Sequence, residues 1–208
     1  MGARSNKGYT LLEMSIVVAL MSGLFLMSAN VMVRSLQVVA TQNVYADVSE
    51  ALRTVSLATA NELTAAILDD LPGKNNVKGL SIPGGSASTV TFQRPLDLGA
   101  ASFTNPAILR VRNEDANGNL KLDKGEDLDG NGILDRVYEC VEDKNNDGKY
   151  TGDGETRILA RNVDAITFKR AAGSHKITAT VTARSGMNVA GVSRILQKQH
   201  EFTVFVRN

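Results

Sequence analysis

The sequence predicts an α+β fold in which a long, hydrophobic N-terminal helix packs on an antiparallel β-sheet that carries acidic loops. Three observations support this prediction. An uncharged apolar run extends from Met14 to Val33, an amphipathic pattern continues it to Leu68, and short alternating segments dominate the chain from Thr89 onward. With 208 residues, 43% of them hydrophobic, the chain can form one membrane helix and one globular domain of about 130–140 residues.

We expect the helix to run from about Tyr9 to Leu68, because no proline interrupts this stretch and Leu71-Pro72-Gly73 follows it. Residues 9–35 form an apolar half, which at 1.5 Å per residue is long enough to cross a hydrocarbon core of about 30 Å. Residues 36–70 form an amphipathic half that would lie across the sheet. Its apolar positions recur at steps of three and four residues, and they are Val44, Val48, Ala51, Leu52, Val55, Ala58, Leu63, Ala66 and Ile67.

Residues 71–208 are expected to form a β-rich globular domain. Short segments rich in β-branched and alternating apolar residues follow one another without intervening helices, which favours an antiparallel sheet. The single cysteine, Cys140, is expected to be a small buried hydrophobe, because no second cysteine is present to form a disulfide. We predict strands at residues 89–92, 108–111, 136–141, 157–160, 165–168, 176–183 and 201–206.

The first eight residues form a short leader that contains Arg4 and Lys7 and no acid. Positive charge ahead of an apolar helix predicts that this end stays in the cytoplasm and that the rest of the chain is exported. After Gly8 the chain reads Tyr9-Thr10-Leu11-Leu12-Glu13, and the apolar run follows. A carboxylate at the edge of a membrane helix is costly, so we expect Glu13 to have a function. Cleavage after Gly8 would free the amine of Tyr9, a cation able to pair with Glu13 of a neighbouring chain.

This order of a glycine, an aromatic residue, Thr-Leu-Leu-Glu and an uncharged span resembles the class III signal of type IV pilins and type II secretion pseudopilins. The resemblance implies a pilin-like fold in which a prepilin peptidase cleaves after Gly8 and Tyr9 becomes the methylated N-terminus. It makes Glu13 the fifth residue of the mature chain and an assembly residue. It also implies a single-pass chain in the bacterial inner membrane that later joins other major and minor pilins or pseudopilins, in a periplasmic pseudopilus or an extracellular pilus.

Two further segments resemble particular subunits of this family. The C-terminal segment Glu201–Asn208 and the segment Arg157–Val163 are similar to those of the W-type and J-type minor subunits. Tip subunits of the K-type usually lack the glutamate, so Glu13 argues against that role. The chain departs from the commoner pattern in having Tyr9 where Phe is usual and in lacking the membrane-half proline of many major pilins.

Two other interpretations of the N-terminus remain open. A cleaved secretory signal would end near Ser28-Ala29, although its apolar region would exceed the usual 7–15 residues and Met27 is bulky for the position three residues before a cut. An uncut single-pass anchor fits the length of the apolar run. Neither interpretation accounts for Glu13 or for the boundary between Gly8 and Tyr9.

Charge is divided along the domain, although the formal net charge of the chain is only +1. The stretch from Asn113 to Glu155 holds 13 acids and 5 bases, a net charge of −8, whereas Thr156–Asn208 holds 9 bases and 2 acids, a net charge of +7. The acidic part is a candidate cation site. The basic part would face acidic partners, a phosphate backbone or solvent.

Oxygen-bearing side chains recur at alternate positions in two acidic loops, residues 113–135 and 142–155. Such spacing is typical of calcium loops, because Ca²⁺ takes six to eight oxygen ligands and alternate residues of a curled loop face inward. We therefore predict that three segments bind Ca²⁺. Their candidate ligands are Asp115, Asn117, Asn119, Asp123 and Glu126 in the first segment, Asp127, Asp129, Asn131 and Asp135 in the second, and Asp143, Asn145, Asp147, Asp153 and Glu155 in the third.

None of these segments completes the EF-hand pattern, because Leu120 replaces its glycine in the first and Tyr138 and Gly154 replace its final glutamate in the others. Asn-Gly and Asp-Gly hairpin turns would also explain part of the composition. Three such segments within about 40 residues would repel one another without a counterion, which favours calcium. We expect the ion to order a surface that meets a partner and to take no part in chemistry.

The sequence predicts a structural protein and no enzyme. Its two histidines, His175 and His200, lie in no metal-ligand or catalytic-triad spacing. We interpret the chain as a minor pilin or pseudopilin that helps to initiate or build a filament. The alternative is a membrane-anchored binding module for calcium-dependent adhesion or for DNA uptake. Nucleic acid would be a partner only in DNA uptake.

Overall fold

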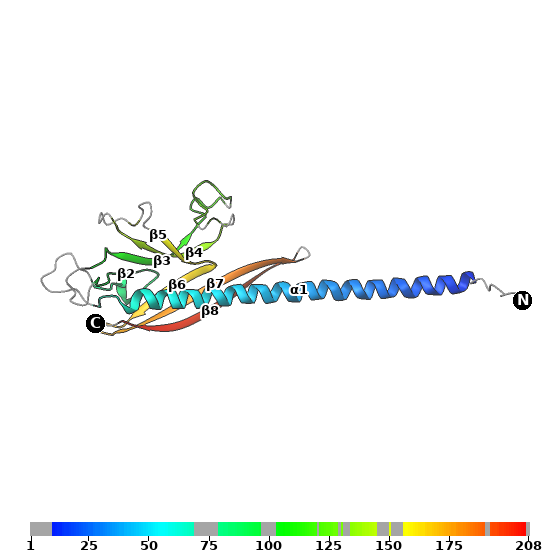
Figure 1. Cartoon of the computed structure of the whole chain (residues 1–208), viewed down its shortest axis with the longest axis horizontal. Helices are drawn as coiled ribbons and strands as arrows, with labels where there is room; N and C mark the ends of the chain where they lie inside the picture. The colour runs from blue at the N-terminus through cyan, green and yellow to red at the C-terminus, as the bar shows by residue number, and fades with distance from the viewer. Residues whose placement is uncertain are drawn as a thin grey trace, which may run out of the picture.

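The computed structural model describes residues 10–68, 79–96, 103–119, 121–128, 130, 134–144, 150, 156–189 and 192–206. Within these ranges, one long helix lies beside two four-stranded antiparallel sheets, which confirms the α+β class (Figure 1). The apolar first half of the helix projects away from the β-rich domain, and the domain packs against one face of the second half (Figure 1).

Helix α1 (Leu11–Thr64) has 54 residues and is continuous, as the absence of proline predicted. It ends a few residues before the predicted Leu68, because the following residues bond to extended chain. The Ile67 N–H donates to the Gln93 carbonyl (2.9 Å), and the Leu80 N–H donates to the Ile67 carbonyl (2.7 Å). These long-range bonds replace the last helical turn.

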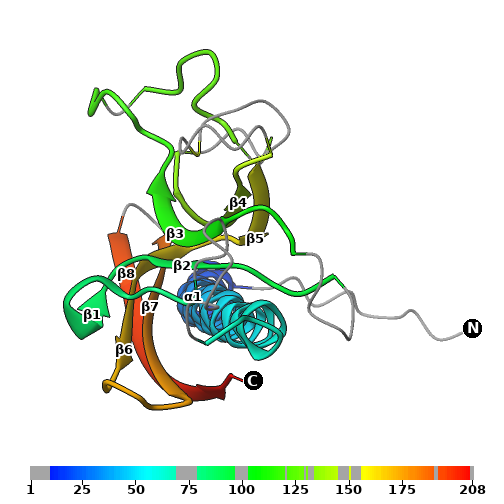
Figure 2. The same ribbon diagram turned by 90° about the vertical axis from the view of Figure 1, so that its left-hand side faces the viewer.

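The first sheet has the strand order β1-β6-β7-β8 and packs against the second half of α1. Figure 2 shows β6, β7 and β8 curving around one side of the helix. Alternate side chains of β7 are buried beneath it, from Ile177 to Ala183. The strands are β1 (Ser86–Ala87), which follows the short 3₁₀ helix η1 (Pro83–Gly85), β6 (Val163–Arg170), β7 (Lys176–Val189) and β8 (Val192–Phe205).

The second sheet has the strand order β2-β3-β4-β5. The strand β4 is buried along almost its whole length, because it lies between β3 and β5 and faces the core. Both acidic loops connect strands of this sheet, the first between β3 and β4 and the second between β4 and β5. The strands are β2 (Val90–Phe92), β3 (Ala107–Asn113), β4 (Arg136–Glu142) and β5 (Thr156–Ala160).

The prediction of a single sheet is wrong, because the chain passes between two sheets twice, each time within two residues. Ser88-Thr89 joins β1 to β2, and Arg161-Asn162 joins β5 to β6. Asn162 has a φ of 59°, which asparagine adopts more readily than most residues. Its carbonyl accepts a hydrogen bond from the Arg184 N–H (3.0 Å). Connections this short resemble hairpin turns in a sequence, so the pattern did not reveal the change of sheet.

Strands β7 and β8 are each 14 residues long, longer than the predicted 176–183 and 201–206. They pair continuously from Lys176–Phe205 to Val189–Val192, whereas β6 pairs with β7 only as far as Ala183. The remainder of β7 and β8 is a two-stranded ribbon. Its polar and glycine residues hid the strand pattern, because a ribbon beyond the core has no need of strict alternation.

The core lies between the second half of α1 and the two sheets. Val48, Val55 and Leu63 of the helix are fully buried, as their three- and four-residue spacing predicted. Cys140 is 1% exposed in this core, which confirms the expectation of a small buried hydrophobe. Burial raises the pKa of its thiol to about 11, so the group is unreactive at neutral pH.

Candidate functional site

Glu13 lies in the first turn of α1 and forms a capping box with Thr10. The Thr10 hydroxyl accepts a hydrogen bond from the Glu13 N–H (3.2 Å), and the Glu13 carboxylate accepts bonds from the Thr10 N–H (2.9 Å) and hydroxyl (3.1 Å). A capping box satisfies N–H groups that have no partner at the start of a helix. Glu13 therefore has a local structural role that the sequence interpretation did not consider. Gly8 and Tyr9 lie outside the described residues.

From Leu11 to Val39, α1 exposes its large apolar side chains in every direction. Leu20 is 65% exposed and Phe25 is 73% exposed. This helix is long and apolar enough to cross a membrane, and none of its most apolar window is buried in the domain. An apolar surface of this length needs lipid or protein to cover it.

The first acidic segment brings four of its predicted ligands together. Asn117 and Asn119 donate their side-chain N–H groups to the same Asp123 oxygen, at 2.8 and 2.7 Å. The Asn119 backbone N–H donates to the Asp115 carboxylate (3.1 Å) and to the Asn117 side-chain oxygen (2.9 Å). The two amide donors hold the pKa of the Asp123 carboxyl below its ordinary value. The loop is therefore curled around its polar side chains.

Glu126, the last predicted ligand of the first segment, is largely buried and closes the loop. Its Oε1 accepts a hydrogen bond from the Ala116 N–H (3.2 Å), and its Oε2 accepts one from the Asp123 N–H (3.1 Å). Each carboxylate oxygen retains capacity for a second partner. Glu126 thus fixes the curvature of the segment and keeps its oxygens near the other polar groups.

Glu114 is a buried residue that the ligand spacing did not reveal. Its Oε1 accepts a hydrogen bond from the Leu128 N–H (2.8 Å), and its Oε2 accepts one from the Asp135 N–H (3.1 Å). Its own N–H donates to the Asp135 carbonyl (3.1 Å). Glu114 therefore ties both ends of the second segment to the end of β3. The position of Glu114 directly after a predicted strand was the one feature of the sequence that could have indicated this role.

The second and third acidic segments are described in part. Asp127 and Asp135 lie near the two ends of the second segment. Asp143 begins the third, is 2% exposed, and donates its N–H to the Pro106 carbonyl (2.9 Å). The remaining predicted ligands lie outside the described residues, and these are Asp129, Asn131, Asn145, Asp147, Asp153 and Glu155.

The donor set of the first segment fits a hard cation. Across the described ranges, no three Asp, Glu, His or Cys side chains converge as metal ligands. The segment offers instead two carboxylates, Asp115 and Asp123, beside the amides of Asn117 and Asn119. Carboxylate and amide oxygens suit Ca²⁺, whereas softer transition metals prefer thiolate or imidazole ligands.

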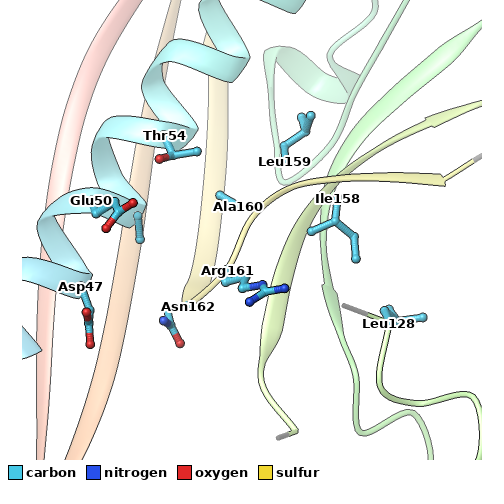
Figure 3. A pocket seen from close by; sticks show the side chains of 10 residues that line it. Asp47, Glu50, Thr54, Leu128, Ile158, Leu159, Ala160, Arg161 and Asn162 are labelled. Atoms are coloured by element: carbon cyan, nitrogen blue, oxygen red, sulfur yellow. The ribbon is translucent and has the colours of Figure 1, made fainter. Parts of the chain in front are cut away.

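A cleft of about 680 Å³ lies between α1 and the turn that joins the two sheets (Figure 3). Asp47 and Glu50 of the helix line one side, and Arg161 and Asn162 line the other. Leu128, which lies at the start of the second acidic segment and donates its N–H to Glu114, also lines the cleft. Leu128 therefore connects the acidic loop to this surface.

A buried ionic cluster joins the end of α1 to the second sheet, and the sequence did not predict it. Glu62 is 6% exposed and is the one charged residue among the buried residues of α1. It forms ion pairs with Arg94 (3.1 Å) and with Arg157. One turn earlier, the Thr59 hydroxyl bonds to the Tyr138 hydroxyl (2.8 Å). These contacts fix the end of the helix against the second sheet and the segment that follows β2.

Comparison of the chain with protein-family models, with curated proteins and with solved structures finds no match in any of the three. The function must therefore be inferred from the residues and the geometry described above.

Proposed function

We propose that this protein is a minor pilin or pseudopilin, a structural subunit that helps to initiate or build a type IV pilus or a type II secretion pseudopilus. The observation that carries the proposal is that α1 exposes its whole apolar half and buries one face of the other half against its own domain. Such a helix joins a folded domain to a surface that lipid or other helices must cover. The signal from Gly8 to Glu13 favours a filament subunit over an ordinary anchor.

Before assembly, α1 would hold the chain in the inner membrane with its β-rich domain exported. Prepilin peptidase would cleave after Gly8, and the amine of Tyr9 would become the N-terminus. The Glu13 carboxylate lies at the start of the helix, close in sequence to that amine. An unmatched charge is costly among packed apolar helices, so pairing Glu13 with the Tyr9 amine of the adjacent subunit would favour assembly.

Calcium would order the acidic loops and neutralise their charge. Glu126 and Glu114 already curl the first two segments by accepting backbone N–H groups. The bound ion would add rigidity to one wall of the cleft in Figure 3, a surface available to sibling subunits. The first-segment residues that would hold the ion are Asp115, Asn117, Asn119 and Asp123.

Processing of the N-terminus tests this function. The full-length chain is co-expressed with a prepilin peptidase, and the membrane form is analysed by mass spectrometry. We expect a chain that begins at Tyr9 and carries one methyl group. A Gly8→Val variant is the matched control and should retain residues 1–8. A known prepilin expressed in the same cells shows whether the peptidase is active. If that prepilin is cleaved and the wild-type chain keeps residues 1–8, the pilin function is contradicted and α1 is an ordinary membrane anchor.

One observation favours DNA uptake as a second function. A cleft of about 450 Å³, at the end of the first sheet opposite the β7–β8 turn, is lined by Lys169, Arg170 and Lys176 together with Ser86 and Ser174. None of the described residues that line this cleft is acidic, which suits phosphate oxygens. Salt-dependent affinity of the full chain for duplex DNA, reduced in a Lys169→Gln/Lys176→Gln variant, would support this function. No affinity at low salt would exclude it.

A further inference from the structure

The first sheet has an outer face, turned away from α1, and the end of this face opposite the two-stranded ribbon carries an exposed aromatic ring. Ile177 of β7 is buried beneath α1, and side chains alternate along a strand, so the adjacent Lys176 faces outward. Phe205 of β8 pairs with Lys176 and is 65% exposed, whereas Val204 beside it is buried. Paired residues of antiparallel strands share a face, which places the ring and the lysine together, with their Cβ atoms about 4.5–5.5 Å apart.

A second cation, Lys169 of β6, lies on the same outer face. It pairs with Thr178, two residues along β7 from Lys176, so the two lysines are diagonal neighbours about 7–8 Å apart. Both lysines are exposed, and both line the cleft of about 450 Å³ together with Ser86 and Ser174. An anionic chain laid across this end of the sheet would meet two cations and no acid of the described residues that line the cleft.

The two lysines can bind a ligand, unlike the arginine beside them. Arg170 donates to the Ser174 carbonyl (2.8 Å) and to the Leu80 carbonyl (3.3 Å), which fix it in the wall of the cleft. The ammonium groups of Lys169 and Lys176 form no hydrogen bond or ion pair with the residues that the structure describes. Their charges are therefore not neutralised by the described part of the chain.

The exposed ring distinguishes between anionic ligands. A nucleic-acid duplex presents phosphates and keeps its bases stacked inside, so it would engage the lysines and leave Phe205 uncovered. A single strand exposes its bases, and these stack on aromatic side chains with little dependence on sequence. An aromatic ring beside cations on the face of an antiparallel sheet is typical of sites that bind single strands.

We propose that this end of the outer face binds single-stranded DNA, with a base stacked on Phe205 and the strand's phosphates at Lys169 and Lys176. Thr178 and Thr203, which pair across β7 and β8 in the same row as Lys169, offer hydroxyl groups to the phosphate oxygens. The inference rests on the DNA-binding function considered above and deepens it, because it names the form of the DNA and the residue that recognises a base.

Binding of a fluorescent oligothymidylate to the full chain in detergent, followed by fluorescence anisotropy over a series of salt concentrations, tests the stacking. We expect Phe205→Ala to weaken binding by about 5- to 150-fold, the equivalent of about 1–3 kcal/mol for one stacked base, without changing the salt dependence. The matched control is Ile195→Ala, which removes an exposed apolar side chain from the other end of β8 and should bind like the wild type.

The same titration tests the two lysines through its salt dependence. Each phosphate contact with a single strand contributes about 0.7 to the slope of log K against log salt, so Lys169→Gln/Lys176→Gln should reduce the slope by about 1.4. Lys121→Gln/Lys124→Gln removes two exposed lysines from the first acidic segment and should leave the slope unchanged. Thermal unfolding by circular dichroism establishes that each variant is folded.

An abasic strand of the same length separates base stacking from charge. It should bind the wild type and Phe205→Ala equally, because it has no base to stack. Equal binding of oligothymidylate by these two proteins would overturn the inference. Binding of polygalacturonate as tight as that of oligothymidylate, with the same loss in Phe205→Ala, would also overturn it and would identify an acidic polysaccharide as the ligand.

The outcomes separate this inference from the functions proposed above. Duplex binding that equals single-strand binding, is lost in Lys169→Gln/Lys176→Gln and persists in Phe205→Ala would overturn the inference and leave DNA uptake supported. Affinity for neither form of DNA at low salt would overturn both. The filament function is tested separately, by cleavage after Gly8, and does not depend on either result.

Discussion

The two halves of α1 belong to one continuous helix, yet their surroundings differ completely. Between Leu11 and Val39 the large apolar side chains are exposed, whereas between Val44 and Leu63 one face is buried by the domain. No proline occurs in either half, so the backbone does not set them apart. The difference lies in the pattern, because the first half is apolar on every side and the second confines apolar residues to one face. Uniform apolarity identifies the half whose partners lie outside the chain.

Removal of a buried leucine should have the largest effect on the domain. Leu63 is fully buried and Leu57 is 54% exposed on the same half of α1. We expect Leu63→Ala to lower the free energy of unfolding by about 2–5 kcal/mol, because it leaves a cavity. The matched variant Leu57→Ala should change it by less than about 0.5 kcal/mol. Urea unfolding of the full chain in detergent, followed by circular dichroism, measures both values, and similar losses would contradict the assignment of the packed face.

A charge in the exposed half should impair insertion and leave the domain stable. Leu20→Arg places a cation inside the apolar run, at a cost of about 2.5–3.5 kcal/mol for membrane insertion. We expect the variant to be released from membranes by alkaline extraction. Leu57→Arg, in the packed half but on its exposed side, should remain in the membrane. Retention of Leu20→Arg would show that this half is covered by something other than lipid.

The Glu62 cluster tests how firmly the packed half is fixed to the second sheet. Glu62→Gln weakens the bonds to Arg94 and Arg157, and we expect a loss of about 1.5–3 kcal/mol in unfolding free energy. Glu50→Gln removes an exposed carboxylate from the same helix and should change stability little. A loss as small as that of the control would show that the cluster contributes nothing measurable.

Calcium should stabilise the domain modestly and should not affect the exposed half of α1. At ten times its Kd, one bound ion adds about 1.4 kcal/mol by mass action. We expect millimolar Ca²⁺ to raise the midpoint of thermal unfolding and to release heat in a calorimetric titration of the full chain. Both responses should weaken in Asp123→Asn and persist in Asp47→Asn, which removes an exposed acid from α1. Equal responses in the two variants would place the ion elsewhere.

Protonation of Asp123, in the first acidic segment, should have the smallest effect of these changes. Hydrogen bonds from Asn117 and Asn119 hold the pKa of the Asp123 carboxyl below its ordinary 3.8. A carboxyl with a lowered pKa in the folded state contributes stability above its unfolded pKa, and this contribution is lost as the pH falls through the lowered value. The segment should therefore loosen only below about pH 4. NMR titration of Asp123 should show its midpoint rise in Asn117→Ala; an unchanged midpoint would show that the amides do not hold it.

The sequence predicted the helix, its two halves and most strand positions, because these depend on local periodicity. Val48, Val55 and Leu63 are buried where the three- and four-residue steps placed them. The division into two sheets was missed, since it depends on turns of two residues such as Arg161-Asn162. The two-stranded ribbon of β7 and β8 was missed because it extends beyond the core, so its sequence lacks the alternation of a half-buried strand.

The candidate site was predicted less completely, for a related reason. Alternating oxygens identified the first acidic segment, whose polar side chains do lie together. Glu114 and Glu62 escaped notice, because their partners are backbone N–H groups or arginines far away in the sequence. Glu13 was interpreted only as an assembly residue, although the pattern Thr10-Leu11-Leu12-Glu13 also predicts the capping box that the structure shows.

The most direct test of the account compares Glu13→Gln with Glu13→Ala for incorporation into the filament. Glutamine can replace glutamate in a capping box, so Glu13→Gln keeps the helix cap and removes only the charge. If Glu13 pairs with the Tyr9 amine of the next subunit, both variants should be folded and cleaved after Gly8, and both should fail to enter the filament. Incorporation of Glu13→Gln at the wild-type level, with failure of Glu13→Ala alone, would show that Glu13 acts only as a helix cap.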